Sequence, residues 1–165
     1  MRPQDIVILL KIIALGDQSW QNKDLAAALF ISPSEISESL HRSAMAGLIN
    51  ADKKRVHRQT LQEFIEYGLH VVFPAIPGGM VNGLFTAHSH PFMRKHFSSS
   101  EPLVWPDIAG KDRGLSLSPL YKDVPKAAQQ DATLYKMLAL LDVVRVGKVR
   151  ELKVALGELN NLLKA

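Results

Sequence analysis

Two short amphipathic segments that meet at a tight turn, residues 23–49, constrain the fold of this chain more than any other feature. In the first segment Leu25 and Leu29 recur at the spacing of one helix face. The second segment opens with Ser32, which can accept hydrogen bonds from free backbone amides, and with Pro33, which fits the first helical position. The pattern therefore predicts two helices joined by a turn.

The second of these helices, residues 32–47, has two faces of different character. Ile36 and Leu40 point inward together, and Gly47 marks the end of the helix. The outward face is polar and consists of Ser34, Glu35, Ser37, Glu38, His41 and Arg42. We expect a helix that its neighbours hold at the back and that exposes its polar side to solvent.

Spacing alone leaves two interpretations of this helix pair open. Any small helical domain can contain two amphipathic helices around a turn. A helix-turn-helix of the same shape presents its second helix to the major groove of DNA, where side chains contact base edges. The order of the apolar, small and capping residues favours DNA binding, and the six polar side chains of helix 32–47 are then the base-reading residues.

Five short motifs follow one another in a fixed order through this region. They are Asp24-Leu25-Ala26, Leu29-Phe30-Ile31-Ser32, Ile36-Ser37, Leu40 and Ala46-Gly47-Leu48-Ile49. The series resembles the winged-helix regulators of bacteria, the MarR-like and related groups, over about residues 5–85. The resemblance implies a sequence-specific DNA-binding transcription regulator. The chain as a whole is similar to small bacterial regulators that accompany toxin or defence genes.

Two features depart from that family pattern. Phe30 stands where the family usually has a turn glycine, so either a bulky residue adopts a left-handed conformation or the turn is built differently. Glu35 and Glu38 offset the charge of Arg42, and glutamate repels phosphate although it can accept a hydrogen bond from cytosine. Much of the affinity for DNA therefore has to come from outside this helix.

A basic run directly follows the second helix. Lys53, Lys54, Arg55 and Arg58 place four fixed positive charges within six residues. Such clusters neutralise DNA phosphates and release counterions, although a solvated basic loop is the alternative. The net charge of +4 also suits a polyanionic partner. We expect these four side chains to contact phosphates and to position helix 32–47 on the bases.

Hydrophobic periodicity over the rest of the chain predicts further helices and one β-hairpin. The expected helices are 5–15, 59–68, 132–146 and 148–164. Strands at 70–75 and 80–86 form the expected hairpin, which we interpret as the wing. The expected fold class is mainly α with a small β-hairpin (α+β), arranged as a winged helix-turn-helix domain over 1–86, an irregular strap over 87–125 and C-terminal helices over 126–165.

The two C-terminal helices carry enough apolar surface to require a packing partner. Helix 132–146 is apolar on nearly every side, and helix 148–164 has a stripe of leucines. We interpret the pair as dimerisation helices of a homodimer. The alternative is an intramolecular hairpin that closes over the strap.

Several classes of site lack the residues that they need. The chain has no cysteine, which excludes disulfide and thiolate chemistry. His88, His90 and His96 lie close together in sequence, but a metal site needs more ligands than they supply. No serine occupies a nucleophile elbow. We therefore expect no enzymatic activity, no cofactor and no metal.

The apolar run between Asp5 and Lys11 is too short for an export segment or a membrane span, so we expect a cytoplasmic protein without membrane contact. The sequence as a whole predicts a homodimeric repressor that occludes an operator on double-stranded DNA. The alternative is an antitoxin or adaptor that keeps the winged-helix fold, binds DNA weakly or not at all, and contacts a partner protein from a neighbouring gene.

Overall fold

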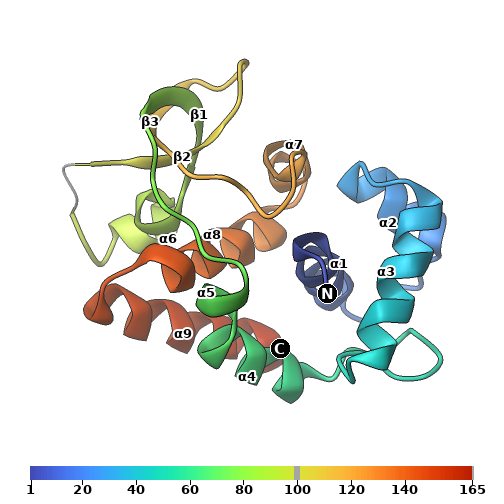
Figure 1. The fold of residues 1–165 in the computed structure, drawn as a ribbon. Coiled ribbons are helices and arrows are strands. Elements are labelled where there is room, and N and C mark those ends of the chain that lie inside the picture. The colour runs from blue at the N-terminus through green and yellow to red at the C-terminus, as the bar shows by residue number, and fades with distance from the viewer. Residues whose placement is uncertain (99–100, 165) are drawn as a thin grey trace.

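The centre of the fold is formed by two helices from opposite ends of the chain (Figure 1). The computed structural model, which describes residues 1–98 and 101–164, places α1 (Pro3–Leu15) against α8 (Ala132–Val146). The helices expected at both places are thereby confirmed. Their contact joins the two ends of the sequence into one hydrophobic core.

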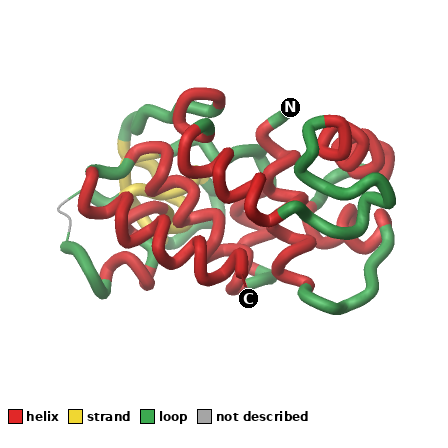
Figure 2. Tube along the Cα trace, turned by 90° about the horizontal axis from the view of Figure 1, so that it is seen from below, coloured by secondary structure: helices red, strands yellow, loops and turns green. Residues whose placement is uncertain are grey.

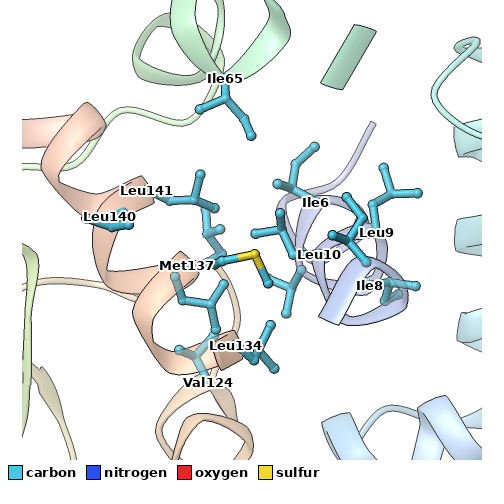
Figure 3. Close-up of a cluster of buried hydrophobic side chains, with 14 of the residues drawn as sticks. Ile6, Ile8, Leu9, Leu10, Ile65, Val124, Leu134, Met137, Leu140 and Leu141 are labelled. Atoms are coloured by element: carbon cyan, nitrogen blue, oxygen red, sulfur yellow. The ribbon is translucent and has the colours of Figure 1, made fainter. Parts of the chain in front are cut away.

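The interior between α1 and α8 is filled by aliphatic side chains and one methionine. Figure 3 shows Met137 of α8 directed toward Leu10 of α1, with Ile6 and Leu134 close by. All four side chains are at most 1% exposed. Because full burial of such a side chain contributes about 1.5–3 kcal/mol, this contact is a major source of stability.

Helices α2 (Asn22–Leu29) and α3 (Pro33–Met45) pack on each other and on α1. The Ser32 hydroxyl accepts a hydrogen bond from the backbone amide of Glu35 at 3.2 Å, so the expected helix cap is present. Phe30 lies at the turn with φ 58°, in the left-handed region, which costs a non-glycine residue about 1–2 kcal/mol. The turn thus joins α2 and α3 without a glycine.

A tight turn leads the chain from α3 back toward the core. Ile49 and Val56 form an antiparallel bridge across its base. The side-chain oxygen of Asn50 accepts hydrogen bonds from two backbone amides of the turn, at 2.9 and 3.0 Å. We call residues 50–55 the basic turn. It holds most of the basic run directly after the C-terminal end of α3.

Residues 70–75, expected as a strand, are not a strand. The helix expected at 59–68 is confirmed as α4 (Arg58–Tyr67), and a short helix, α5 (Leu69–Val72), follows it. The two β-branched residues of α5, Val71 and Val72, favour a strand by composition. Both are half-exposed or more, so they offer no buried face to a sheet. The expected wing hairpin is therefore wrong.

The strand expected at 80–86 is confirmed as β1 (Met80–Thr86), but its partners come from further along the chain. It pairs antiparallel with β2 (Leu103–Pro106) and with β3 (Asp112–Ser116), and β2 pairs parallel with β3 to close a small barrel. At Gly83 the strands approach so closely that a β-carbon would lie 1.9 Å from the carbonyl oxygen of Trp105. Only glycine fits at this crossing.

The segment 87–125, expected as an irregular strap, carries regular structure. Besides β2 and β3 it contains η1 (Ala87–Ser89) and α6 (Pro91–Arg94), and α7 (Val124–Gln129) begins at its end. Figures 1 and 2 show the strands at one end of the molecule and α2 and α3 at the other. Residues 87–125 therefore form most of the end of the molecule that lies opposite to α2 and α3.

Helix α9 (Val149–Lys164) runs back along α8, as Figure 1 shows. Its buried residues are Ala155, Leu159 and Leu163, and the other sides of α8 are covered by α1, α5, α7 and η1. The intramolecular hairpin thus accounts for the burial that we attributed to a subunit interface. None of the described helices combines the length and the apolar character needed to cross a membrane.

Replacing Met137 by alanine should lower the free energy of unfolding by about 2–5 kcal/mol, because the side chain is fully buried between α1 and α8. Urea denaturation followed by circular dichroism measures the loss. Met45 is a matched control, since it is 78% exposed and its replacement by alanine should change the free energy by less than about 0.5 kcal/mol. Equal losses in the two variants would contradict this core.

Candidate nucleic-acid interface

The outward side of α3 forms an exposed polar row. Its exposed members are Ser34, Ser37, Glu38 and His41. The row continues one helical turn further with Met45, which is 78% exposed. The opposite side of α3 is anchored in the core by Ile36 and Leu40, which are at most 2% exposed. We call the five exposed side chains the α3 row.

Glu35 and Arg42, which we expected on this face, are held by contacts within the chain. Nη2 of Arg42 lies 2.8 Å from Oδ1 of Asp5, and its Nε lies 3.1 Å from Oδ2. The same Nη2 contacts Oε1 of Glu35 at 2.5 Å. Asp5 is fully buried and also accepts a hydrogen bond from the Ser39 hydroxyl at 2.6 Å. Glu35 and Arg42 therefore connect α3 to α1 instead of standing free for base contacts.

The network keeps the buried carboxyl of Asp5 ionised. Burial alone raises the pKa of that carboxyl, but hydrogen bonds from Arg42 and Ser39 outweigh burial and hold the pKa below its ordinary value. The hydrogen bond to Asp5 likewise raises the pKa of Arg42 above its ordinary value. Because a buried charge without its partner costs about 3–5 kcal/mol, this pair fixes α3 on α1.

The basic turn places three cations shortly after the C-terminal end of α3. Nζ of Lys54 donates to the carbonyl oxygen of Trp20 at 2.9 Å and lies 3.9 Å from the centroid of its ring, a cation–π contact. Lys53, whose φ is 60°, and Arg55 have no ion-pair partner among the residues that the structure describes. The charges of Lys53 and Arg55 are therefore available to a ligand.

Arg58, the fourth expected phosphate contact, is directed to another part of the chain. It begins α4, and its Nη1 donates to the carbonyl oxygen of Leu163 in the last turn of α9 at 2.5 Å. This carbonyl belongs to a helix end, where oxygen atoms lack partners within the helix. Arg58 thus links α4 to α9, so we do not expect its side chain to contact DNA phosphates.

The start of α2 supplies a cation that the sequence pattern did not mark. Lys23 is exposed in the first turn of α2. Together with Trp20 and Lys54 it lines an open hollow of about 500 Å³. A single exposed lysine gives no signal in a sequence, and only the fold brings Lys23 next to the basic turn.

Histidines gather near η1 and α6, but the described part of the chain contains no group of three or more potential metal ligands. His90 is 7% exposed, its Nδ1 accepts a hydrogen bond from the amide of Phe92 at 3.1 Å, and its ring packs edge-on against Tyr135. Burial and the nearby charge of Lys136 lower the pKa of His90 to about 4. His90 is therefore a neutral helix cap at pH 7.

Comparisons with protein-family models, with curated proteins and with solved structures find no match to this chain. The resemblance to MarR-like regulators stays a hypothesis. The structural features that bear on function are the α3 row, the ion-pair network of Asp5, Arg42 and Glu35 behind it, and the basic turn.

Replacing Asp5 by asparagine should lower the free energy of unfolding by about 3 kcal/mol at neutral pH, because Arg42 loses its buried counter-charge and keeps only the more exposed Glu35 and Glu38. The native pKa of Asp5 lies below its unfolded value of about 3.8. Its stabilisation is therefore complete above that value and is lost as the pH falls through the native pKa. The difference between wild type and variant should shrink in strong acid.

Urea denaturation at neutral pH and at about pH 3 measures this difference. Asp17, which is exposed, serves as the matched control, and its replacement by asparagine should change the free energy of unfolding by less than about 0.5 kcal/mol. A deficit of the Asp5 variant that is the same at both pH values would refute an ionised Asp5 in the folded protein.

Proposed function

We propose that this chain binds double-stranded DNA and regulates transcription. The observation that carries the proposal is the α3 row, which the core holds rigidly from behind and which the basic turn flanks. An α-helix fits the major groove, and cations beside it reach the phosphates along the groove. Exposure of the polar side of α3 is the condition that such a role requires.

The α3 row supplies hydrogen-bonding groups and one apolar group for base contacts. Ser34 and Ser37 can donate or accept, Glu38 can accept from N4 of cytosine, and His41 offers a ring nitrogen. The side chain of Met45 can make an apolar contact with the methyl group of thymine. Glu35 and Arg42 support the row through the network with Asp5, so they act on orientation and not on base choice.

In this proposal the contacts with DNA phosphates come from the basic turn and from the start of α2. Lys53 and Arg55 have charges without a partner among residues 1–98 and 101–164, and Lys54 is positioned on Trp20 before any ligand arrives. Lys23 lines the same hollow as Lys54. Each phosphate that such a side chain neutralises releases counterions, so binding has to weaken steeply with salt.

Repression by operator occlusion follows from this mode of binding, because a protein seated in the major groove blocks access to the same DNA. Two copies on half-sites about one helical turn apart would match the usual symmetry of such sites. Since α8 is buried within one chain, a dimer would have to use another surface.

Replacing Lys53, Lys54 and Arg55 together by alanine should weaken binding to every duplex and flatten its salt dependence. Loss of three phosphate contacts should reduce the slope of log K against log salt by about 3. Fluorescence anisotropy with a fragment of the gene's own promoter, over a series of salt concentrations, measures both quantities. An unchanged affinity and slope would show that the basic turn does not contact DNA.

A triple variant that removes the same charge elsewhere is the matched control. Lys111, Lys122 and Lys153 are exposed and lie outside α3 and the basic turn. Their replacement by alanine should leave the slope within about 1 of the wild-type value. Replacing Ser37 or His41 by alanine should instead alter the preference among duplexes and keep the slope, because these residues face bases and carry no fixed charge.

A second candidate function is favoured by apolar residues exposed around α5. Tyr67, Val71, Val72 and Ile76 are 71%, 68%, 50% and 88% exposed. Exposed apolar groups of this kind are typical of protein contacts. An antitoxin or adaptor would use them to bind a partner protein from a neighbouring gene. Co-purification of that partner together with no shift of promoter DNA would favour this function over the first.

A further inference from the structure

A pocket of about 510 Å³ lies where α8 passes into α9. Figure 1 shows that this junction lies on the opposite side of the molecule from α3. Its volume is within the range of small-molecule sites. Its apolar wall consists of Ala75, Ile76, Pro77, Leu103, Leu115 and Val146. These side chains come from the loop before β1, from β2 and β3 and from the end of α8. The wall can cover a short hydrocarbon body.

Arg145 has N–H groups that no residue in the described part of the chain uses. Its side chain is 5% exposed and lines the pocket. Nε donates to the carbonyl oxygen of Phe73, and Nη1 donates to that of Ser118 and to Oδ1 of Asp142, at 2.9, 3.1 and 2.9 Å. Among the described residues, Nη2 has no partner, and Oγ of Ser43 is the only buried side-chain nitrogen or oxygen without one. Nη2 is therefore not fully buried, and Arg145 is one of the residues that line the pocket.

The guanidinium is fixed in place by a buried carboxylate. Asp142 is 2% exposed and accepts hydrogen bonds from Oγ1 of Thr86 at 2.7 Å and from Nε1 of Trp105 at 2.6 Å. These donors hold Asp142, and Asp142 holds Arg145. Since the guanidinium loses little freedom when a ligand binds, its free edge is preorganised for an anion.

The rim of the pocket adds charges of both signs. Lys148 lines the pocket, is exposed and has no ion-pair partner in the described part of the chain. The carboxylate of Glu151 lies 3.8 Å from Nδ1 of His88, and Glu101 also lines the pocket. Two carboxylates in the wall disfavour a ligand with two negative charges, so a monoanion fits better.

We propose that this pocket binds a small monocarboxylate with an apolar body. The carboxylate accepts hydrogen bonds from Nη2 of Arg145 and pairs with Lys148, while the hydrocarbon lies on Leu103, Leu115 and Val146. The site goes beyond the proposed DNA binding and does not depend on it, because it shares no residue with the α3 row or the basic turn.

Isothermal titration of the full chain with hexanoate, hexanamide and hexylamine tests the ligand class, since the three probes share a hydrocarbon body and differ in charge. Hexanoate should bind saturably, and the amide and the amine should bind at least about tenfold more weakly. Equal binding of hexylamine, or no saturable binding of hexanoate, would overturn the proposal.

Two rim variants test the residues without touching the buried network of Arg145. Replacing Lys148 by glutamine should weaken hexanoate binding by about threefold to tenfold, and replacing Glu151 by glutamine should strengthen it, because the first removes an attractive charge and the second a repulsive one. Lys153, exposed on the same helix as Glu151 but not in the pocket wall, is the control, and its replacement by glutamine should leave the affinity unchanged. Shifts of the same sign in the two rim variants would refute the carboxylate orientation.

Discussion

The arrangement of this protein depends on the burial of the central part of α1. Six consecutive residues of this helix, from Asp5 to Leu10, are buried, and one of them is a carboxylate. The apolar members pack on α8, α2 and α3, and the carboxylate binds Arg42 of α3. One helix therefore joins the C-terminal half by apolar contact, and it joins α2 and α3 by apolar contact and by charge. Because a buried carboxylate requires its partner, α3 has little freedom to shift.

The helices of this chain could be predicted because their signals are local. Periodic apolar residues and the cap at Ser32 gave α3 and α8 to within a few residues of their ends. The sheet could not be predicted in the same way. Its pairs, such as Gly83 with Pro106, join residues 12 to 35 positions apart, and nothing near β1 marks its partners. The composition of α5 was misleading, because its valines stay on the surface.

The candidate interface shows the same division between local and distant information. The pattern of helix 32–47 identified which side chains point outward, and those of Ser34, Ser37, Glu38 and His41 are exposed. It could not tell that Arg42 is held by a carboxylate 37 residues away or that Lys54 rests on a tryptophan 34 residues away. Whether a surface charge is free is decided by the tertiary fold, so composition alone overestimates the groups available to a ligand.

The contact between Lys54 and Trp20 gives the molecule an intrinsic optical reporter. The chain has two tryptophans, and the other, Trp105, is 1% exposed and hydrogen-bonded to Asp142 inside the core. A cation that rests on an indole ring perturbs its excited state, so departure of Lys54 from the ring would change the emission of Trp20 and leave that of Trp105 alone. The fluorescence of the unlabelled protein therefore has one component from the candidate interface and one from the core.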